Sequence, residues 1–129
     1  MTHKFKIPML PQSVNSLYKV NYRTRQIYLS EEGRKFKNTA KMFIPKIKFS
    51  SEKPVIDIRI KYFGNWYCKN GNVRRVDGPN LDKVLFDAIF ERLGLDDSLV
   101  FFWQGRKECG EEEYTEVEIS EVLEPKELE

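Results

Sequence analysis

Four polar residues recur at helical spacing in the segment 79–93. At about 100° per residue, Asn80, Lys83, Asp87 and Glu91 fall on one stripe of a helix. Lys83 and Asp87 stand four positions apart, and such an ion pair adds about 0.2–0.5 kcal/mol to the stability of any exposed helix. Helix stability alone explains the stripe, so its flanks decide whether it carries chemistry.

The flanks of this segment are rich in charge. Arg74, Arg75 and Asp77 lead into it, and Asp96 and Asp97 follow it. A helix, a turn and a strand can return Asp97 beside the start of the sheet, so that carboxylates distant in sequence can converge. Clustered carboxylates repel one another and are costly to keep ionised without a cation. Hard oxygen ligands favour Mg²⁺ or Mn²⁺, and nearby cations can neutralise phosphate, so the pattern predicts a metal-dependent phosphodiesterase.

The charge distribution along the chain points to a polyanionic partner. Residues 1–107 hold 21 of the 22 Lys and Arg but only 10 of the 20 Asp and Glu, a balance of +11. Residues 108–129 hold one lysine and ten glutamates, a balance of −9. Nucleic acid is the commonest partner of so basic a body. A solvated surface with an acidic segment that keeps the protein dispersed explains the charge equally well.

Several classes of protein are excluded by length and composition. The 129 residues fit one domain spanning 1–129, with an acidic C-terminal segment at 108–129. A lone histidine, His3, and two cysteines 41 positions apart argue against zinc sites and histidine-based nucleophiles. The chain has neither an apolar run of membrane-spanning length nor a signal-peptide pattern near Met1. We expect a cytoplasmic protein without a membrane partner or a small organic cofactor.

The elements that must position these residues follow from hydrophobic periodicity. Alternation predicts strands, an i, i+3, i+4 pattern predicts helices, and Pro and Gly mark their ends. Outward-facing Glu116 and Glu118 suggest that the last strand lies at a sheet edge. The order β-α-β-α-β-β predicts an α+β domain with two helices packed on a small mixed sheet. The expected elements are strands 4–7, 54–63, 99–103 and 113–122 and helices 31–44 and 79–93, with 11–29 and 64–72 as loops.

Three features leave alternatives open. Phe86 and Phe90 fall on a third side of the second helix, where they would form either a two-fold dimer contact or another layer of core. Basic and aromatic residues alternate in the loop 11–29, which would either hold a DNA backbone and stack on splayed bases or be a solvated loop. The basic residues of that loop are Lys19, Arg23 and Arg25. The glutamate-rich end would either mask the basic face or solvate an edge strand.

Linked motifs at matching spacing carry a resemblance to a known family. They are Arg75-Val76-Asp77-Gly78-Pro79-Asn80-Leu81-Asp82-Lys83, Phe86-Asp87-Ala88 and Leu95-Asp96-Asp97-Ser98-Leu99-Val100. Together they resemble the signature of the RusA family of Holliday-junction resolvases, which reads approximately R-x-D-x-D-N-L-x-K-x-x-x-D-A-L followed by D-D-x-x-V. Pro11-Gln12-Ser13-Val14-Asn15 and Ser30-Glu31-Glu32-Gly33 match two further family segments. The likeness covers residues 5–120 and points to a crossover-junction endodeoxyribonuclease of a kind common on prophages.

The resemblance implies a small homodimeric α+β nuclease that binds four-way DNA junctions and cuts paired phosphodiesters with Mg²⁺, for which Mn²⁺ can substitute. Carried over by position, Asp77 and Asp97 would bind metal, and Asp87 matches the aspartate of the D-A-L element. Lys83 would contact or polarise the scissile phosphate. Asp96 also matches, but we rank it lower because the neighbour of Asp97 should point elsewhere. Arg75 and Asn80 would support the site, and Lys107 matches a basic family position. Independently of the resemblance, their charge makes Arg74, Lys19, Arg23 and Arg25 further candidates for substrate binding.

One position departs from the family pattern. The family has a second aspartate immediately before Asn-Leu, and Pro79 stands there in this chain. Asp87 and Glu91 are better placed than Asp82 to complete a metal shell, because Asp82 projects about 100° away from Lys83. The alternative is a non-catalytic junction-binding protein with a degenerate metal site, which would bind DNA without cutting it. A third, weaker alternative is a small phage adaptor whose partner is another protein.

Overall fold

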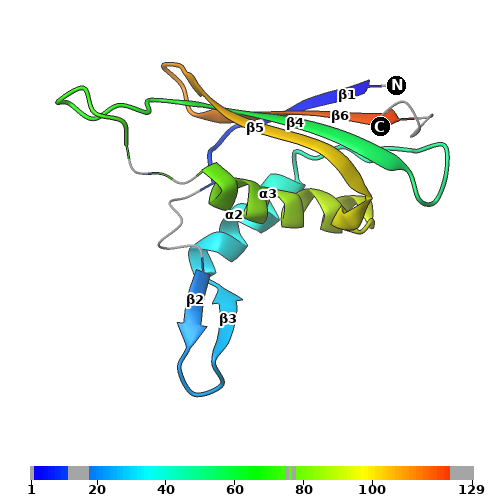
Figure 1. Ribbon diagram of the computed structural model, residues 1–129, viewed down its shortest axis with the longest axis horizontal. Helices are drawn as coiled ribbons and strands as arrows, with labels where there is room; N and C mark the ends of the chain where they lie inside the picture. The colour runs from blue at the N-terminus through cyan, green and yellow to red at the C-terminus, as the bar shows by residue number, and fades with distance from the viewer. Residues whose placement is uncertain (1, 12–17, 75, 77, 123–129) are drawn as a thin grey trace.

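A four-stranded mixed sheet carries two helices on one face, and a two-stranded hairpin projects from the helical side (Figure 1). The computed structural model describes residues 2–11, 18–74, 76 and 78–122. The sheet order is β1-β6-β4-β5. The strands are β1 (Thr2–Ile7), β2 (Tyr18–Asn21), β3 (Gln26–Leu29), β4 (Val55–Gly64), β5 (Val100–Cys109) and β6 (Tyr114–Val122), and the helices are α2 (Glu31–Lys41) and α3 (Gly78–Leu93).

β4 organises the sheet, as its strict alternation predicts. Ile56, Ile58, Ile60 and Tyr62 are buried, and they point to the face that the helices cover. β4 pairs antiparallel with β6 on one side and parallel with β5 on the other. A parallel neighbour requires a crossover connection, which α3 provides. The predicted α+β fold with two helices on a mixed sheet is therefore confirmed.

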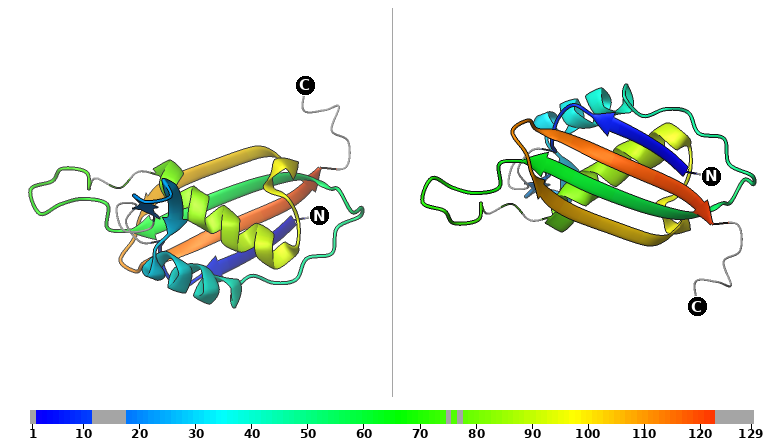
Figure 2. Two further views of the ribbon diagram at one scale, coloured as in Figure 1. Left: turned by 90° about the horizontal axis from the view of Figure 1, so that it is seen from below. Right: turned by 90° about the horizontal axis from the view of Figure 1, so that it is seen from above.

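The expectation that the last strand lies at an edge is wrong. β6 lies between β1 and β4, and the edges of the sheet are β1 and β5. The outward glutamates serve a different purpose, because Glu118 is in register with Lys4 and Arg59 across its two neighbours. Glu116 lies likewise between two lysines. Cross-strand pairs of opposite charge stabilise an exposed sheet face, and this is the face that no helix covers (Figure 2).

Both helices begin where the sequence indicates. The Ser30 hydroxyl accepts a hydrogen bond from the Gly33 backbone N–H at 3.1 Å and so caps α2. α2 ends at Lys41, three residues before the predicted end, because the chain turns there ahead of Pro45. α3 spans Gly78–Leu93, and Gly94 follows it with a φ of 69° that glycine adopts without strain.

The aromatic pair on α3 belongs to the core. Phe90 is only 4% exposed, and Phe86 is half-buried against the same apolar cluster. The two rings pack edge to face with centroids 5.8 Å apart. The segment after α3 folds back over this side, since the Leu95 N–H donates to the Phe90 carbonyl. Of the two alternatives for this pair, the structure favours a further layer of core over an exposed dimer contact.

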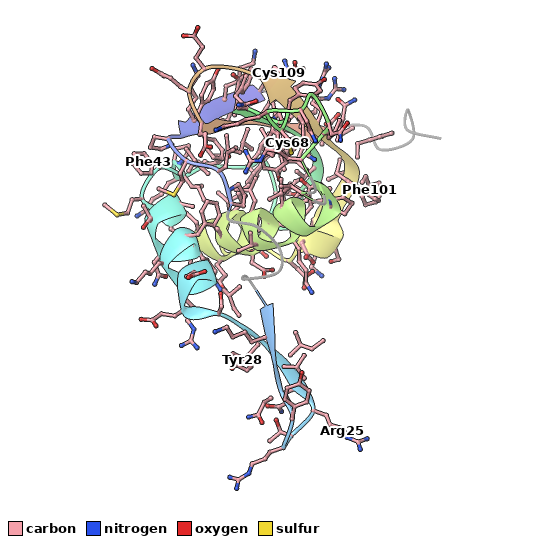
Figure 3. The ribbon with its side chains drawn as sticks, turned by 90° about the vertical axis from the view of Figure 1, so that its left-hand side faces the viewer. Arg25, Tyr28, Phe43, Cys68, Phe101 and Cys109 are labelled. Atoms are coloured by element: carbon pink, nitrogen blue, oxygen red, sulfur yellow. The ribbon has the colours of Figure 1, made fainter. Side chains whose placement is uncertain are left out.

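The segment 11–29, expected to be a loop, contains the hairpin β2–β3. Val20 is in register with Ile27 and Lys19 with Tyr28, and the turn at Tyr22–Arg25 closes the hairpin. The hairpin stands clear of the sheet and both helices, with Arg25 at its tip and Tyr28 nearer its base (Figure 3). β5 is also longer than predicted, because it continues past Trp103 to Cys109 beside β4.

In the part of the chain that the structure describes, no helix is long and apolar enough to cross a membrane.

Candidate active site

Asp87 and Asp97 line one surface cavity of about 240 Å³ beside the C-terminal half of α3. Asp87 comes from the polar stripe of the helix. Asp97 comes from the short 3-10 turn η1 (Asp97–Leu99), which links α3 to β5. The structure thus brings together two carboxylates that the sequence separates by ten positions. The other residues that line this cavity are Phe86, Phe90, Glu91, Leu95 and Asp96.

The electrostatics of Asp87 reflect this proximity. Partial burial raises its pKa, and the negative charges of Glu91 and Asp97 raise it further. The positive charges of Lys37 and Lys83 act in the opposite direction. The ionised form of Asp87 is therefore disfavoured chiefly by burial, with a smaller contribution from Glu91 and Asp97, and a cation bound between Asp87 and Asp97 would favour it.

Glu91, the last residue of the polar stripe, joins the two helices. Its carboxylate forms ion pairs with Lys37, at 2.5 Å, and with Lys41, both from α2. The two ammonium groups hold the pKa of Glu91 below its usual range. Both of its oxygens are engaged in helix packing, which makes Glu91 a poorer candidate metal ligand than its position on the stripe suggested.

Asp96 has a structural role. It precedes η1, and its carboxylate accepts a hydrogen bond from the Ser98 backbone N–H at 2.8 Å. This capping bond lowers the pKa of Asp96. The cap also fixes the turn that carries Asp97.

Near the start of α3, Lys107 holds the segment that enters the helix. Its ammonium group donates to the Val76 carbonyl at 2.5 Å and lies 5.0 Å from the centre of the Trp66 ring. Arg74 lies over the same ring and donates to the Asn65 carbonyl at 2.7 Å. The predicted substrate-binding residues Arg74 and Lys107 are thus gathered around one tryptophan.

The predicted residues divide between the two ends of α3. Asp87 and Asp97 lie toward its C-terminal end, and Lys107 contacts Val76 before its N-terminal end. The 16 residues of α3 span about 24 Å. Lys83 is exposed between the two ends. Arg75, Asp77 and the side chain of Asn80 lie outside the described residues.

The two aspartates do not make a complete metal shell by themselves. Among residues 2–11, 18–74, 76 and 78–122, no three Asp, Glu, His or Cys side chains gather closely enough to hold one ion. Mg²⁺ and Mn²⁺ favour about six oxygen ligands, several of which can be water. Hard oxygen donors facing one cavity fit such an ion, with the remaining protein ligands to be supplied from elsewhere.

A comparison with protein families identifies the chain. The family model described as endodeoxyribonuclease RusA matches residues 8–120. The chain belongs to the RusA family. No protein with a curated description matches it. As a RusA-family protein it is a metal-dependent endodeoxyribonuclease that resolves Holliday junctions in DNA recombination and repair, and its substrate is junction DNA.

Pro79, which replaces an aspartate of the RusA signature, lies in the first turn of α3, where proline needs no backbone donor. It lines a cavity of about 410 Å³ that Asp82 and Lys107 also line. The carboxylate of Asp82 accepts a hydrogen bond from the buried Tyr62 hydroxyl at 2.5 Å. Burial raises the pKa of Asp82, and the Tyr62 bond opposes that shift. The Asp82 carboxylate therefore joins α3 to the sheet through its hydrogen bond to Tyr62.

Sequence reasoning missed three contributors to this RusA-type site. Lys37 and Lys41 lie four apart on α2, a spacing that marks one face of a helix. The sequence alone could not say that this face meets Glu91. Gly105 was missed as well: a Cβ there would lie 2.7 Å from an Asp82 carboxylate oxygen, so a side chain at this position would push that carboxylate aside.

Proposed function

We propose that this RusA-family nuclease binds Mg²⁺ through Asp77, Asp87 and Asp97 and cleaves four-way junctions as a homodimer, with Mn²⁺ as a possible substitute. The observation that carries the proposal is the shared cavity of Asp87 and Asp97, formed where the polar stripe of α3 meets the turn before β5. A bound Mg²⁺ would activate water and neutralise charge on the phosphate.

The basic residues near this face have separate roles in the proposal. Lys83 lies one helical turn before Asp87 and would contact the scissile phosphate. Lys107 positions the backbone of Val76, the residue immediately before Asp77. Arg74 and Arg75, with Asn80, would bind the flanking phosphates. The chemistry is in-line attack by water on phosphorus with departure of the 3′ oxygen.

The case for a homodimer comes from the length of α3. Val76 and Gly78, the chain neighbours of Asp77, lie at one end of the helix, and Asp97 follows the other end. About 24 Å of helix separates the two ends, too far for direct sharing of one ion. Two copies with antiparallel α3 helices would bring Asp77 of one copy toward Asp87 and Asp97 of the other. Each dimer would then contain two equivalent sites, as paired cuts require.

The exposed side chains of the edge strand β5 support this dimer. Side chains from Phe101 to Arg106 are exposed, and Phe101, Phe102 and Trp103 are 54%, 43% and 65% accessible. The run from Val100 to Gly105 carries no charge and lies at an edge of the sheet. Natural edge strands avoid such runs because they associate with other chains. We assign this edge to a second copy of the chain.

Antiparallel pairing of two β5 edges produces the arrangement that the site needs. A two-fold axis perpendicular to the sheet would keep all four helices on one face and set the two α3 helices antiparallel. The Asp82–Gly105 contact places the first half of α3 over the middle of β5. The N-terminal end of one α3 would then face the C-terminal end of the other.

Mixing two inactive variants tests the shared site. We expect Asp77→Asn and Asp97→Asn each to abolish cleavage of a synthetic four-way junction. In a mixed dimer, one site would carry both substitutions and the other would be intact. A refolded mixture should therefore recover nicking of one strand without paired cuts. If the mixture stays as inactive as either variant while heterodimers form, the two residues act within one chain.

The proposal also places the enzyme in the cytoplasm, where its DNA substrate lies. The exposed thiols of Cys68 and Cys109 are compatible with a reducing compartment.

A further inference from the structure

The hairpin β2–β3 is an arm without a core of its own. Its strands pair only with each other and not with the four-stranded sheet. Side chains from Lys19 to Tyr28 are all exposed (Figure 3). A two-stranded hairpin is only marginally stable alone in water. Its exposed surface is therefore suited to a partner that adds contacts.

The composition of the arm favours a polyanionic partner. Lys19, Arg23 and Arg25 lie between residues 18 and 29, and that stretch has no acidic residue. The tip also carries Tyr22, which is 91% exposed. Exposed arginines next to an exposed aromatic ring suit nucleic acid, because phosphates attract the cations and bases stack on the ring.

The tip is locally ordered in spite of its exposure. The Asn21 side-chain oxygen accepts hydrogen bonds from the backbone N–H of Arg23 at 3.0 Å and of Thr24 at 3.4 Å. Arg25 adopts a φ of 56°, which completes the turn. These constraints fix the directions in which Tyr22 and the arginines leave the backbone. A defined tip can discriminate between shapes of DNA, whereas a random loop would add charge alone.

The position of the arm gives it access to the same DNA as the active site. It projects from the helical side of the sheet, the side on which α2 and α3 lie (Figure 1). It leads directly into α2, whose Lys37 contacts Glu91 on α3. DNA that lies along the helices would meet the arm away from the scissile phosphate.

We infer that the arm recognises the branch point: Tyr22 stacks on a base exposed where strands exchange, while Arg23 and Arg25 bind the adjoining phosphates. In a continuous duplex the bases are already stacked on one another, so Tyr22 has no free base face to contact. The arm thus supplies selectivity for branched over linear DNA, separately from the carboxylates. This inference rests on the proposed function, because it takes a junction as the substrate.

Binding measurements without metal test the arm apart from catalysis. Affinities of the full chain for a four-way junction and for a linear duplex of the same sequence are measured in EDTA. Tyr22→Ala should weaken junction binding at least about five-fold and leave duplex binding unchanged, since stacking acts on a single base. Tyr22→Trp should keep the junction affinity. A 2-aminopurine base at the branch point should report the lost stacking through its fluorescence.

The charged residues of the tip should behave differently from the ring. The double variant Arg23→Ala, Arg25→Ala should weaken binding to both DNA forms and reduce the salt slope by about two. The matched control is Lys46→Ala, Lys48→Ala, which removes two exposed lysines from the connection between α2 and β4. This control should retain the ratio of junction to duplex affinity.

Two results would overturn the inference: Tyr22→Ala binds the junction as tightly as the natural chain, or it weakens junction and duplex binding by the same factor. Because Tyr22 is exposed, its replacement should not alter the melting temperature, which is measured alongside. A failure of the proposed function shows itself separately, as absent cleavage by the natural chain with Mg²⁺ or Mn²⁺.

Discussion

The ammonium group of Lys107 on β5 donates a hydrogen bond to the carbonyl of Val76, 31 positions earlier in the chain, at 2.5 Å. β5, which follows α3 in the chain, thereby holds the segment that precedes α3. In this RusA-family chain the segment leads directly to Asp77, one of the proposed metal ligands. The contact joins the fold to the proposed metal site.

Replacement of Lys107 by methionine should impair catalysis more than folding. Loss of the bond to Val76 would let the segment before α3 shift, and small displacements of catalytic groups can cost up to about a hundred-fold in rate. We expect junction cleavage to fall on the order of ten- to a hundred-fold, with more Mg²⁺ needed for half-maximal rate. Lys61→Met is the matched control, because Lys61 alternates with the buried Ile60 and Tyr62 and so lies on the opposite face of β4. Equal losses in the two variants would contradict a positioning role.

Glu91→Gln should loosen the packing of α2 on α3. The ion pairs with Lys37 and Lys41 are partly exposed, so we expect a loss of about 0.5–1 kcal/mol in the free energy of unfolding at neutral pH and low salt. Because the pKa of Glu91 is lowered in the folded state, its contribution is present above its unfolded pKa and lost as the pH falls through the folded value.

Urea unfolding at several pH values measures this effect. The difference between the natural chain and Glu91→Gln should shrink in acid and at high salt. Glu52→Gln, at an exposed position between α2 and β4, should leave stability unchanged. A difference that persists in acid would show that the pairs with α2 are not its source.

Gly105→Ala should destabilise the fold by about 1–3 kcal/mol, because the new Cβ would lie 2.7 Å from an oxygen of Asp82. Asp82→Ser shortens the opposing side chain and should recover part of the loss, so the two effects should not add. Gly78→Ala is the control, since nothing lies within 4 Å of a Cβ there. Additive effects in the double variant would refute the close approach.

Asp82→Asn should change the pH dependence of stability. Burial raises the pKa of Asp82 in the folded state, so the natural chain loses stability as the pH rises from the unfolded pKa through the folded one. Asparagine cannot ionise and still accepts the Tyr62 hydrogen bond. The unfolding free energy of the variant should therefore decline less steeply as the pH rises above about 4, the unfolded pKa of aspartate. A decline as steep as that of the natural chain would assign the effect to other groups.

The sequence predicts those parts of the fold that one element determines alone. The alternation of Ile56, Ile58 and Ile60 predicts β4, and the periodicity of Leu81, Val84 and Leu85 predicts the buried side of α3. The sequence did not predict that β6 lies in the centre of the sheet, because the neighbours of β6 are set by pairing with strands distant in sequence. The outward glutamates of an edge strand and of a charge-paired central strand look the same in sequence.

The candidate site was predictable in its residue types and only partly in its geometry. Asp87 was assigned from the helical stripe, and Asp97 from the family resemblance and the helix–turn–strand argument. Glu91 shares that stripe, yet its partners come from α2, which no local pattern encodes. The hairpin at 18–29 was not predicted, because its alternation of apolar and polar residues is short and interrupted by arginines. Turn and strand patterns therefore overlap in this segment.

Cleavage by Asp97→Asn is the most direct test of the carboxylate assignment. A labelled four-way junction is incubated with the natural chain or the variant in Mg²⁺, Mn²⁺ or EDTA, and binding is measured in parallel. We predict paired symmetric cuts by the natural chain with either metal, none in EDTA, and none by the variant, which should bind the junction at least as tightly. Cleavage by Asp97→Asn at the natural rate would contradict the metal assignment, and junction binding without any cutting by the natural chain would indicate a degenerate site.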